Sequence, residues 1–339
     1  MDSHDPNLFK YNISTWITDL VEYWINRCNI KNKKTVYNSE LIASKNTVMP
    51  NNFVMYQCIY NKGIECIFDT YTTFNKDAIP RLEWYKEYFK KMDNNYSFTF
   101  YFNHLDLFGK PTYLGDIDAI CVGCSVNSRN FHAIPILDAH HLWECKKITV
   151  YNPDYDLQFD HTPFDNKINK IVWRGGLIPT FSEDLNLLYL RKDVCDKWID
   201  NSNFDIGVSN NNTPYSKSFL NLNDYTKYKY ILNIDGYGAS FDGTIWKLRS
   251  TSLVIWITDP NNQMYMLEWY FPLLKPYVHY VPSSIDKLQE TFDWCEENPE
   301  ECKKIITNST ILINNILQNT DAYHQALFAR FNEIYNITI

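Results

Sequence analysis

Glycine and proline are scarce in this sequence: its 339 residues include 10 glycines and 14 prolines. Collagen-like and low-complexity chains need far more of both, so these classes are excluded. Apolar runs are also short, and residues 252–258 fall far short of the ~20 that a membrane-spanning helix needs, so no membrane span is predicted. Because 45% of the residues are hydrophobic and 16% are aromatic, the chain can bury the cores of a globular protein of about two domains.

Positive charge is in deficit, since 32 Lys and Arg residues face 40 Asp and Glu residues and give a formal net charge of −8. A general nucleic-acid-binding protein needs a basic surface for the phosphate backbone, so no nucleic-acid partner is predicted. A small phosphate-bearing ligand needs only local positive charge and stays open. Residues 1–8 contain neither a basic segment nor an apolar stretch of the kind found in signal peptides, which predicts a cytoplasmic protein.

Several catalytic and metal-binding patterns are missing. The sequence contains no G-x-S-x-G, H-E-x-x-H or Walker pattern, which disfavours serine hydrolases, zincins and P-loop enzymes. Nine cysteines without an export signal favour reduced thiols. Cys121 and Cys124 have the spacing of a redox or metal pair, but no second CxxC accompanies them, so we expect buried thiols and keep a thiol or metal protein as an alternative. His140 and His141 are adjacent and would point to opposite sides of a strand, so no metal site is predicted.

The spacing of apolar residues indicates an α/β protein. In the first half we expect helices at 12–28 and 81–92 and strands at 97–103 and 117–122. Residues 151–169 lack periodicity and are interpreted as the link between two domains. In the second half we expect strands at 170–173, 228–234, 252–258 and 278–281, and helices at 182–199 (with Ser182 as N-cap), 241–250, 284–297, 299–317 and 320–335. The succession of strand, glycine turn, helix and strand over 228–258 is the βαβ unit of a parallel sheet.

The turn after strand 228–234 is the first candidate ligand site. Its glycines, Gly236 and Gly238, let the backbone approach a ligand closely, and the helix that follows directs its unpaired N–H groups at an anion. The third glycine of a dinucleotide fingerprint is missing, so a plain tight turn is equally consistent with the local pattern. Its position favours binding, because ligands of open α/β sheets sit at the carboxyl ends of strands.

Three further residues occupy comparable positions. Arg174 follows strand 170–173, where its guanidinium could reach a phosphate, although a surface ion pair would explain it equally well. Lys247 lies in the helix after the glycine turn and could support a bound diphosphate, with a solvated helix face as the alternative. Asp106 follows strand 97–103 and could take a proton from a hydroxyl group, although it is one acid among 40. The local sequence leaves the role of His132 open.

Longer stretches of the sequence then show a resemblance. Residues 228–241 read Tyr-Lys-Tyr-Ile-Leu-Asn-Ile-Asp-Gly up to Gly236 and continue to Ala239-Ser240-Phe241, and residues 268–282 read Glu-Trp-Tyr-Phe-Pro-Leu-Leu-Lys-Pro-Tyr-Val-His-Tyr-Val-Pro. Together they closely resemble the protein O-glucosyltransferase/CAP10 family, glycosyltransferase family 90. Residues 172–175 (Val-Trp-Arg-Gly) resemble its aromatic-Arg-Gly segment, and residues 125–143 resemble its amino-domain segment more loosely.

The resemblance implies a GT-B architecture, in which two Rossmann-like domains face each other across a cleft. We therefore expect an acceptor-side domain at 1–160, a nucleotide-sugar domain at 161–318, and a terminal helix at 319–339 that packs back on the first domain. Such a protein moves a sugar, usually glucose or xylose, from its UDP-sugar to a hydroxyl of a glycan or glycoprotein. Transfer inverts the anomeric centre and forms a β-linkage.

The resemblance also assigns residues to roles. The family's base lies in an Asn-x-x-Asp context after an amino-domain strand, and Asn103-His-Leu-Asp106 stands at that place. Inversion needs a base on one face of the sugar and a stabilised diphosphate on the other. The donor side is expected to comprise Arg174, Gly175, Asp235, Gly236, Gly238, Ala239, Ser240, Phe241 and Lys247. Sugar or acceptor contacts are expected at His132, Trp143 and Tyr237.

Two positions depart from the family pattern. Asp242 and Asp184 stand where the family's animal members have arginines, which leaves Lys247, Arg249 or a divalent metal to supply the missing positive charge. No other cofactor is predicted. A non-catalytic protein that binds sugars or nucleotide sugars on the same scaffold is therefore the alternative function. The sequence also lacks the endoplasmic-reticulum retention signal of many animal members, and its composition is typical of an AT-rich genome such as that of a protist or a large DNA virus.

Overall fold

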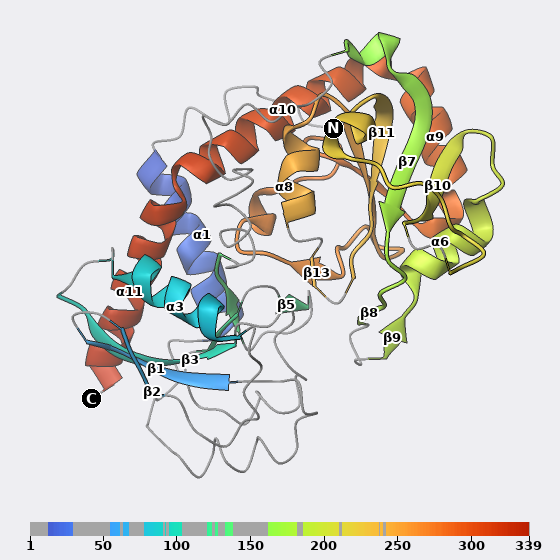
Figure 1. Cartoon of the computed structure of the whole chain (residues 1–339). Helices are drawn as coiled ribbons and strands as arrows, with labels where there is room; N and C mark the ends of the chain where they lie inside the picture. Colours follow the sequence, from blue (N-terminus) through green and yellow to red (C-terminus); the bar gives the residue numbers. More distant parts are fainter. Residues whose placement is uncertain are drawn as a thin grey trace.

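The computed structural model describes residues 13–29, 55–61, 64–67, 78–90, 92, 95–103, 121–123, 126–127, 133–137, 162–181, 186–209, 212–236, 238–239 and 242–338. These residues form a mixed α/β structure with two five-stranded sheets, one in each half of the chain (Figure 1). The statements below concern this part of the chain.

The sheet of the second half is entirely parallel. Its strands are β7 (Ile168–Gly175), β10 (Phe204–Val208), β11 (Tyr228–Asn233), β12 (Leu253–Ile257) and β14 (Val281–Ser283), arranged in the order β10-β7-β11-β12-β14. All five residues of β12 are buried, as expected for a central parallel strand with both faces covered. The predicted βαβ unit is confirmed, since β11, α8 (Asp242–Arg249) and the parallel β12 follow one another.

Helices cover both faces of this sheet. The side chains of β12 alternate between two cores: Ile255 packs in the core that includes α6 (Leu190–Trp198) and α9 (Leu288–Glu297). Trp256 packs in the core that includes residues of α8 and α10 (Pro299–Gln318). The remaining short elements of this half are η4 (Phe164–Asn166), β8 (Thr180–Phe181), β9 (Leu187–Leu188), α7 (Leu222–Tyr225), β13 (Met266–Leu267), η5 (Phe271–Leu273) and η6 (Ile285–Lys287).

The sheet of the first half is mixed. Its strands are β1 (Met55–Asn61), β2 (Ile64–Ile67), β3 (Ser97–Asn103), β4 (Cys121–Gly123) and β6 (Ile134–Pro135), in the order β2-β1-β3-β4-β6. β1 is antiparallel to β2 and β3, whereas β3, β4 and β6 are parallel. Its helices are α1 (Ile13–Arg27) and α3 (Ala78–Phe89).

The last helix, α11 (Thr320–Thr338), lies against the sheet of the first half. Its Phe328 packs edge-on against Phe98 of β3, with ring centroids 5.3 Å apart, and lies 4.8 Å from the ring of Phe89 in α3. α10 runs along the second half, and α11 continues from it toward the first sheet (Figure 1). One hydrophobic core therefore contains residues that are more than 200 positions apart in the sequence.

Two further contacts join the halves. β5 (Val126–Asn127) pairs antiparallel with β13, so a two-stranded ribbon contains one strand from each half. The indole N–H of Trp24 in α1 donates a hydrogen bond to the backbone oxygen of Trp269, at 2.8 Å. Helices α10 and α11, the β5–β13 ribbon and this hydrogen bond therefore fix the two sheets to each other.

In the second half, two predicted elements differ from the structure and one strand of the parallel sheet was not predicted. The helix predicted at 182–199 begins only at Leu190, because Leu187 and Leu188 pair with residues 180–181 in a small hairpin. The strand predicted at 278–281 is β14 at Val281–Ser283, because the amides of residues 278 and 279 both donate to the backbone oxygen of Lys275 in a turn. β10 was not predicted, because Asp205 and Gly207 are both residue types that strands disfavour.

Candidate functional site

The order of strands marks one edge of the parallel sheet as a candidate binding site. β7 comes first in the chain but lies between β10 and β11, so the chain leaves β7 toward one side of the sheet and leaves β11 toward the other. In open α/β sheets, ligands bind where the carboxyl ends of two such neighbouring strands diverge. Arg174, Gly175 and Gly176 lie at the carboxyl end of β7, and Asp235 and Gly236 follow β11. The structure thus brings two of the predicted donor segments together.

Arg191, in the first turn of α6, connects the two segments. Its Nη1 donates to the backbone oxygen of Gly176 at 3.2 Å, and its Nη2 and Nε donate to those of Ile234 (3.1 Å) and Asp235 (3.2 Å). Its guanidinium also stacks on the ring of Trp173, 5.9 Å from the centroid. Arg191 was not predicted as a site residue. The predicted helix began eight residues before α6 does, so Arg191 was expected well inside a helix and not at the sheet edge.

Side chains pack closely against glycine at two positions of this edge. A Cβ atom on Gly236 would lie 2.9 Å from Nη2 of Arg191, and a Cβ on Gly175 would lie 2.6 Å from the ring of Trp173. The amide of Gly236 donates to the backbone oxygen of Gly238 at 3.1 Å, which closes the turn after β11. The glycines therefore permit the close packing of backbone and side chains here.

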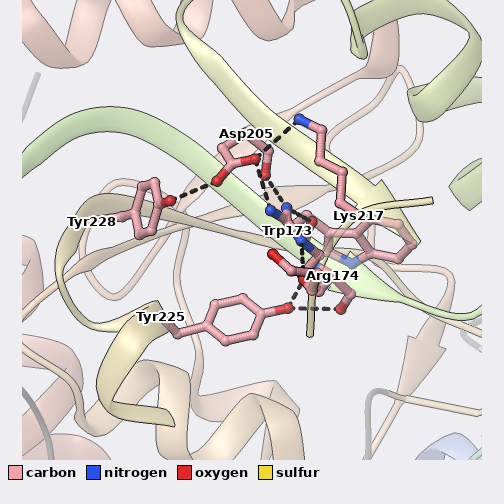
Figure 2. Close-up of polar contacts among 7 residues, drawn as sticks. Trp173, Arg174, Asp205, Lys217, Tyr225 and Tyr228 are labelled. Atoms are coloured by element: carbon pink, nitrogen blue, oxygen red, sulfur yellow. Dashed lines mark hydrogen bonds and ion pairs between the residues drawn. The ribbon is translucent and has the colours of Figure 1, made fainter. Parts of the chain in front are cut away.

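The side chain of Arg174 points toward Asp205, as Figure 2 shows. Its Nη2 forms an ion pair with Asp205 Oδ1 at 2.8 Å, and its side chain is only 5% exposed. Nη1 donates to the backbone oxygens of Trp173 and Asp205, and Nε donates to that of Ser218. The guanidinium is thus engaged with its own domain, and a contact with a phosphate would require it to turn away from Asp205. The predicted contact stays a prediction.

Asp205 is the centre of this polar cluster. Its Oδ1 also accepts from Lys217 Nζ at 3.0 Å, and its Oδ2 accepts from the hydroxyl of Tyr228 at 2.5 Å (Figure 2). Burial raises the pKa of Asp205, but the hydrogen bonds from Tyr228, Arg174 and Lys217 outweigh burial and lower the pKa to about 2. The hydroxyl of Tyr225 accepts from the amide of Arg174 and donates to its carbonyl oxygen, which fixes the end of β7.

Asp235 and Lys247 are buried beneath the glycine turn, with exposures of 0% and 7%. Oδ2 of Asp235 accepts from the amide of Met266 in β13, at 3.2 Å, so the turn is tied to the ribbon that joins the two halves. Burial raises the pKa of Asp235 to about 7, although Arg191 and Lys247 act against this rise. Nζ of Lys247 donates to Oδ1 of Asn233 at 2.6 Å. Lys247 therefore lies below the turn and not on a solvated helix face.

The other predicted site residues divide into two groups. Gly238 accepts the turn hydrogen bond described above, and Ala239 is buried. The remaining predicted residues lie outside the described part of the chain: Asp106, His132, Trp143, Tyr237, Ser240 and Phe241, with Asp184, Cys124, His140 and His141.

A cavity of about 380 Å³ lies beside the carboxyl ends of β12 and β14. Its lining includes Ser283, Trp294 and two residues with left-handed backbone, Asn262 (φ 62°) and Tyr277 (φ 58°). It shares no lining residue with the turn after β11. Among the described residues, no group of three or more His, Cys, Asp and Glu side chains is arranged to hold a metal ion.

The four cysteines whose side chains are described are buried and are not part of disulfides: Cys28, Cys195, Cys295 and Cys302. Within the described ranges no helix has the length and apolar character needed to cross a bilayer. The cytoplasmic location stays a prediction.

The sequence is similar to viral and animal proteins. It is 31% identical over 195 residues to uncharacterized protein 179R of Invertebrate iridescent virus 6, covering 47% of this chain and 16% of the viral protein. It is 33% identical over 125 residues to protein O-glucosyltransferase 1 of Homo sapiens, covering 35% of this chain and 30% of the human protein. It is 28% identical over 178 residues to protein O-glucosyltransferase 2 of Danio rerio, covering 50% of this chain and 34% of the fish protein. The matches thus span about a third or less of these relatives' own lengths.

A family model gives the broader match. The model described as glycosyl transferase family 90 matches residues 144–338, which include the whole parallel sheet and the edge formed by β7 and β11. This match covers more than half of the chain and confirms the predicted resemblance: the chain belongs to glycosyl transferase family 90.

Proposed function

We propose that this chain is a glycosyltransferase that holds a UDP-sugar at the edge formed by β7 and β11. The sugar, glucose or xylose, is transferred to a hydroxyl of a glycan or glycoprotein with inversion to a β-linkage. One observation carries the proposal: the segment that matches the family contains a parallel sheet whose strand order sets a ligand edge, and glycines line that edge. The proposal includes a GT-B arrangement, supported by two separate sheets that are tied together by the β5–β13 ribbon.

The donor's diphosphate would lie at the turn after β11. This turn precedes α8, and the N-terminus of a helix presents unpaired N–H groups and a partial positive charge to an anion. In the proposal, Gly236, Gly238 and Ala239 supply the close backbone, and Lys247 adds positive charge. Ser240 and Phe241 stay proposed donor-binding residues. Arg174 and Gly175 shape the facing end of β7.

The base would come from the first half of the chain. Asp106 follows β3 by three residues, because that strand ends at Asn103. In a single displacement, the acceptor oxygen forms a bond to the anomeric carbon while the bond to the phosphate oxygen breaks. The acceptor's proton passes to the Asp106 carboxylate, and UDP leaves with the electron pair. Proton transfer of this kind typically contributes about 10²–10⁴ in rate. His132, Trp143 and Tyr237 are the proposed sugar contacts.

The test is release of UDP from a panel of UDP-sugars, with and without EDTA, by the wild type and by Asp106→Asn. We expect Asp106→Asn to lose about 10²–10⁴ in rate while its affinity for UDP is unchanged. The matched control is Asp286→Asn, the same substitution at a side chain that is 85% exposed, which should retain full activity. Transfer that persists in Asp106→Asn would exclude this residue as the base. UDP-sugar binding without turnover in the wild type would favour the non-catalytic binding protein instead.

A further inference from the structure

Arg191 is a partly buried cation without a carboxylate partner among the described residues. In the described part of the chain, its three hydrogen bonds all go to backbone oxygens, and no acid lies within ion-pair distance of it. Two other arginines do have such partners: Arg174 is paired with Asp205 at 2.8 Å and Arg330 with Glu22 at 2.6 Å. Charges that are removed from water are normally paired, so among the described residues Arg191 lacks a negative charge in direct contact with it.

The guanidinium also keeps unused donors at the ligand edge. Arginine has five N–H groups, of which the Nε–H and one on each of Nη1 and Nη2 are engaged. One N–H on Nη1 and one on Nη2 remain. Nη2 is the atom that a Cβ on Gly236 would approach to 2.9 Å, so this nitrogen lies directly against the glycine turn. Arginine commonly binds phosphate through two N–H groups at once.

The surrounding charges leave the edge short of negative charge. Burial lowers the pKa of Arg191, and the acid that acts against this most strongly is Asp235. Burial raises the pKa of Asp235 itself to about 7, so its carboxyl group carries only part of a negative charge at neutral pH. Among the described side chains, the acid that acts on Arg191 is therefore only partly ionised, so the positive charge of Arg191 is incompletely balanced although the whole chain carries a net charge of −8.

We propose that Arg191 binds the diphosphate of the donor through its two unused N–H groups and supplies the main positive charge at this edge. That the anion belongs to a nucleotide sugar rests on the proposed function. That the edge binds a diphosphate rests on the contacts of Arg191 alone. Phosphate binding, which was predicted for Arg174, is thus assigned to Arg191 of α6. Hydrogen bonds to the backbone at the ends of β7 and β11 hold Arg191 in position.

The test compares affinities for inorganic pyrophosphate, UDP and uridine by calorimetry in the wild type, Arg191→Gln and Lys192→Gln. Hydrogen bonds to charged groups are worth about 1.5–3 kcal/mol, so Arg191→Gln should weaken pyrophosphate and UDP about 10- to 100-fold and leave uridine unchanged. Lys192→Gln removes one positive charge from the neighbouring position, where the side chain is 49% exposed, and should change none of the three affinities. Circular dichroism and melting curves establish that each variant is folded.

The outcomes separate this inference from the proposed function. Unchanged pyrophosphate and UDP affinities in a folded Arg191→Gln would overturn the inference, even if the wild type transfers sugar. Pyrophosphate binding that depends on Arg191, without turnover of any UDP-sugar, would support the inference and count against the transferase. If Arg191→Gln does not fold, a crystal structure of the wild type with UDP decides: a phosphate oxygen within hydrogen-bonding distance of Nη1 or Nη2 supports the inference, and phosphates bound elsewhere overturn it.

Discussion

His324 makes the stability of the α11 interface depend on pH. The side chain is fully buried, and its Nε2 accepts a hydrogen bond from the amide of Leu137 at 3.2 Å. Nδ1 lies 2.8 Å from the backbone oxygen of Thr320, to which it donates, and 2.9 Å from the hydroxyl of Tyr88. This network requires a neutral ring with its proton on Nδ1, because a proton on Nε2 would face the N–H of Leu137.

The size of the effect follows from the pKa. Burial lowers the pKa of His324 from its ordinary value of 6.5 to about 4. Because the folded state binds the proton less tightly than the unfolded state, stability is complete above pH 6.5 and falls as the pH drops below that value, with the full loss reached below pH 4. The two pKa values predict a loss of about 2 kcal/mol at pH 5 and about 3 kcal/mol at the limit.

Urea unfolding of the wild type and His324→Gln at several pH values between 7.5 and 5 measures this loss. The wild type should lose about 2 kcal/mol more than the variant over this interval, whatever their difference at pH 7.5. Burial also lowers the pKa of His279 to about 4, but this contribution is present in both proteins and cancels. Equal pH dependence of the two unfolding free energies would refute the reasoning.

Two further predictions concern the end of β7. Asp205→Asn should lower the free energy of unfolding by about 2 kcal/mol at pH 7, because the pKa of Asp205, about 2, lies below the ordinary 3.8. The stability that the ionised Asp205 contributes is complete above pH 4 and is lost as the pH falls through 2. A difference in urea unfolding free energy that stays constant down to pH 3 would contradict this prediction. Gly175→Ala should cost about 1–3 kcal/mol, because the new methyl would lie 2.6 Å from the ring of Trp173. Gly176→Ala is its matched control, since the nearest atom there is 3.7 Å away, and equal melting temperatures of the two alanine variants would count against the steric argument.

The parallel sheet could be predicted where apolar runs are continuous. The strands predicted at 228–234 and 252–258 correspond to β11 and β12. They could be predicted because strands that are buried on both faces consist almost entirely of apolar residues. β10 escaped prediction because Asp205 is retained there as the counter-charge of Arg174, 31 residues earlier, and local propensity contains no information about that pairing.

The candidate site was predictable in position but not in side-chain direction. Strand ends identified Arg174 and the Gly236 turn, and the structure does place both at one sheet edge. The direction of the Arg174 guanidinium is set by Asp205, a long-range contact that the sequence does not reveal. Arg191 was missed because the leucines at 185–190 fit a helix and a hairpin equally well, and only the pairing of β8 with β9 decides between them.

The packing of α11 has a consequence for synthesis of the chain. Phe98 and Phe100 leave the ribosome more than 200 residues before Phe328 and Phe331, the aromatic residues that cover them. Until α11 has been made, Phe98 lacks the two rings of α11 that pack against it. Apolar surface that stays exposed during synthesis favours aggregation, so this aromatic face is a site where the nascent chain needs protection.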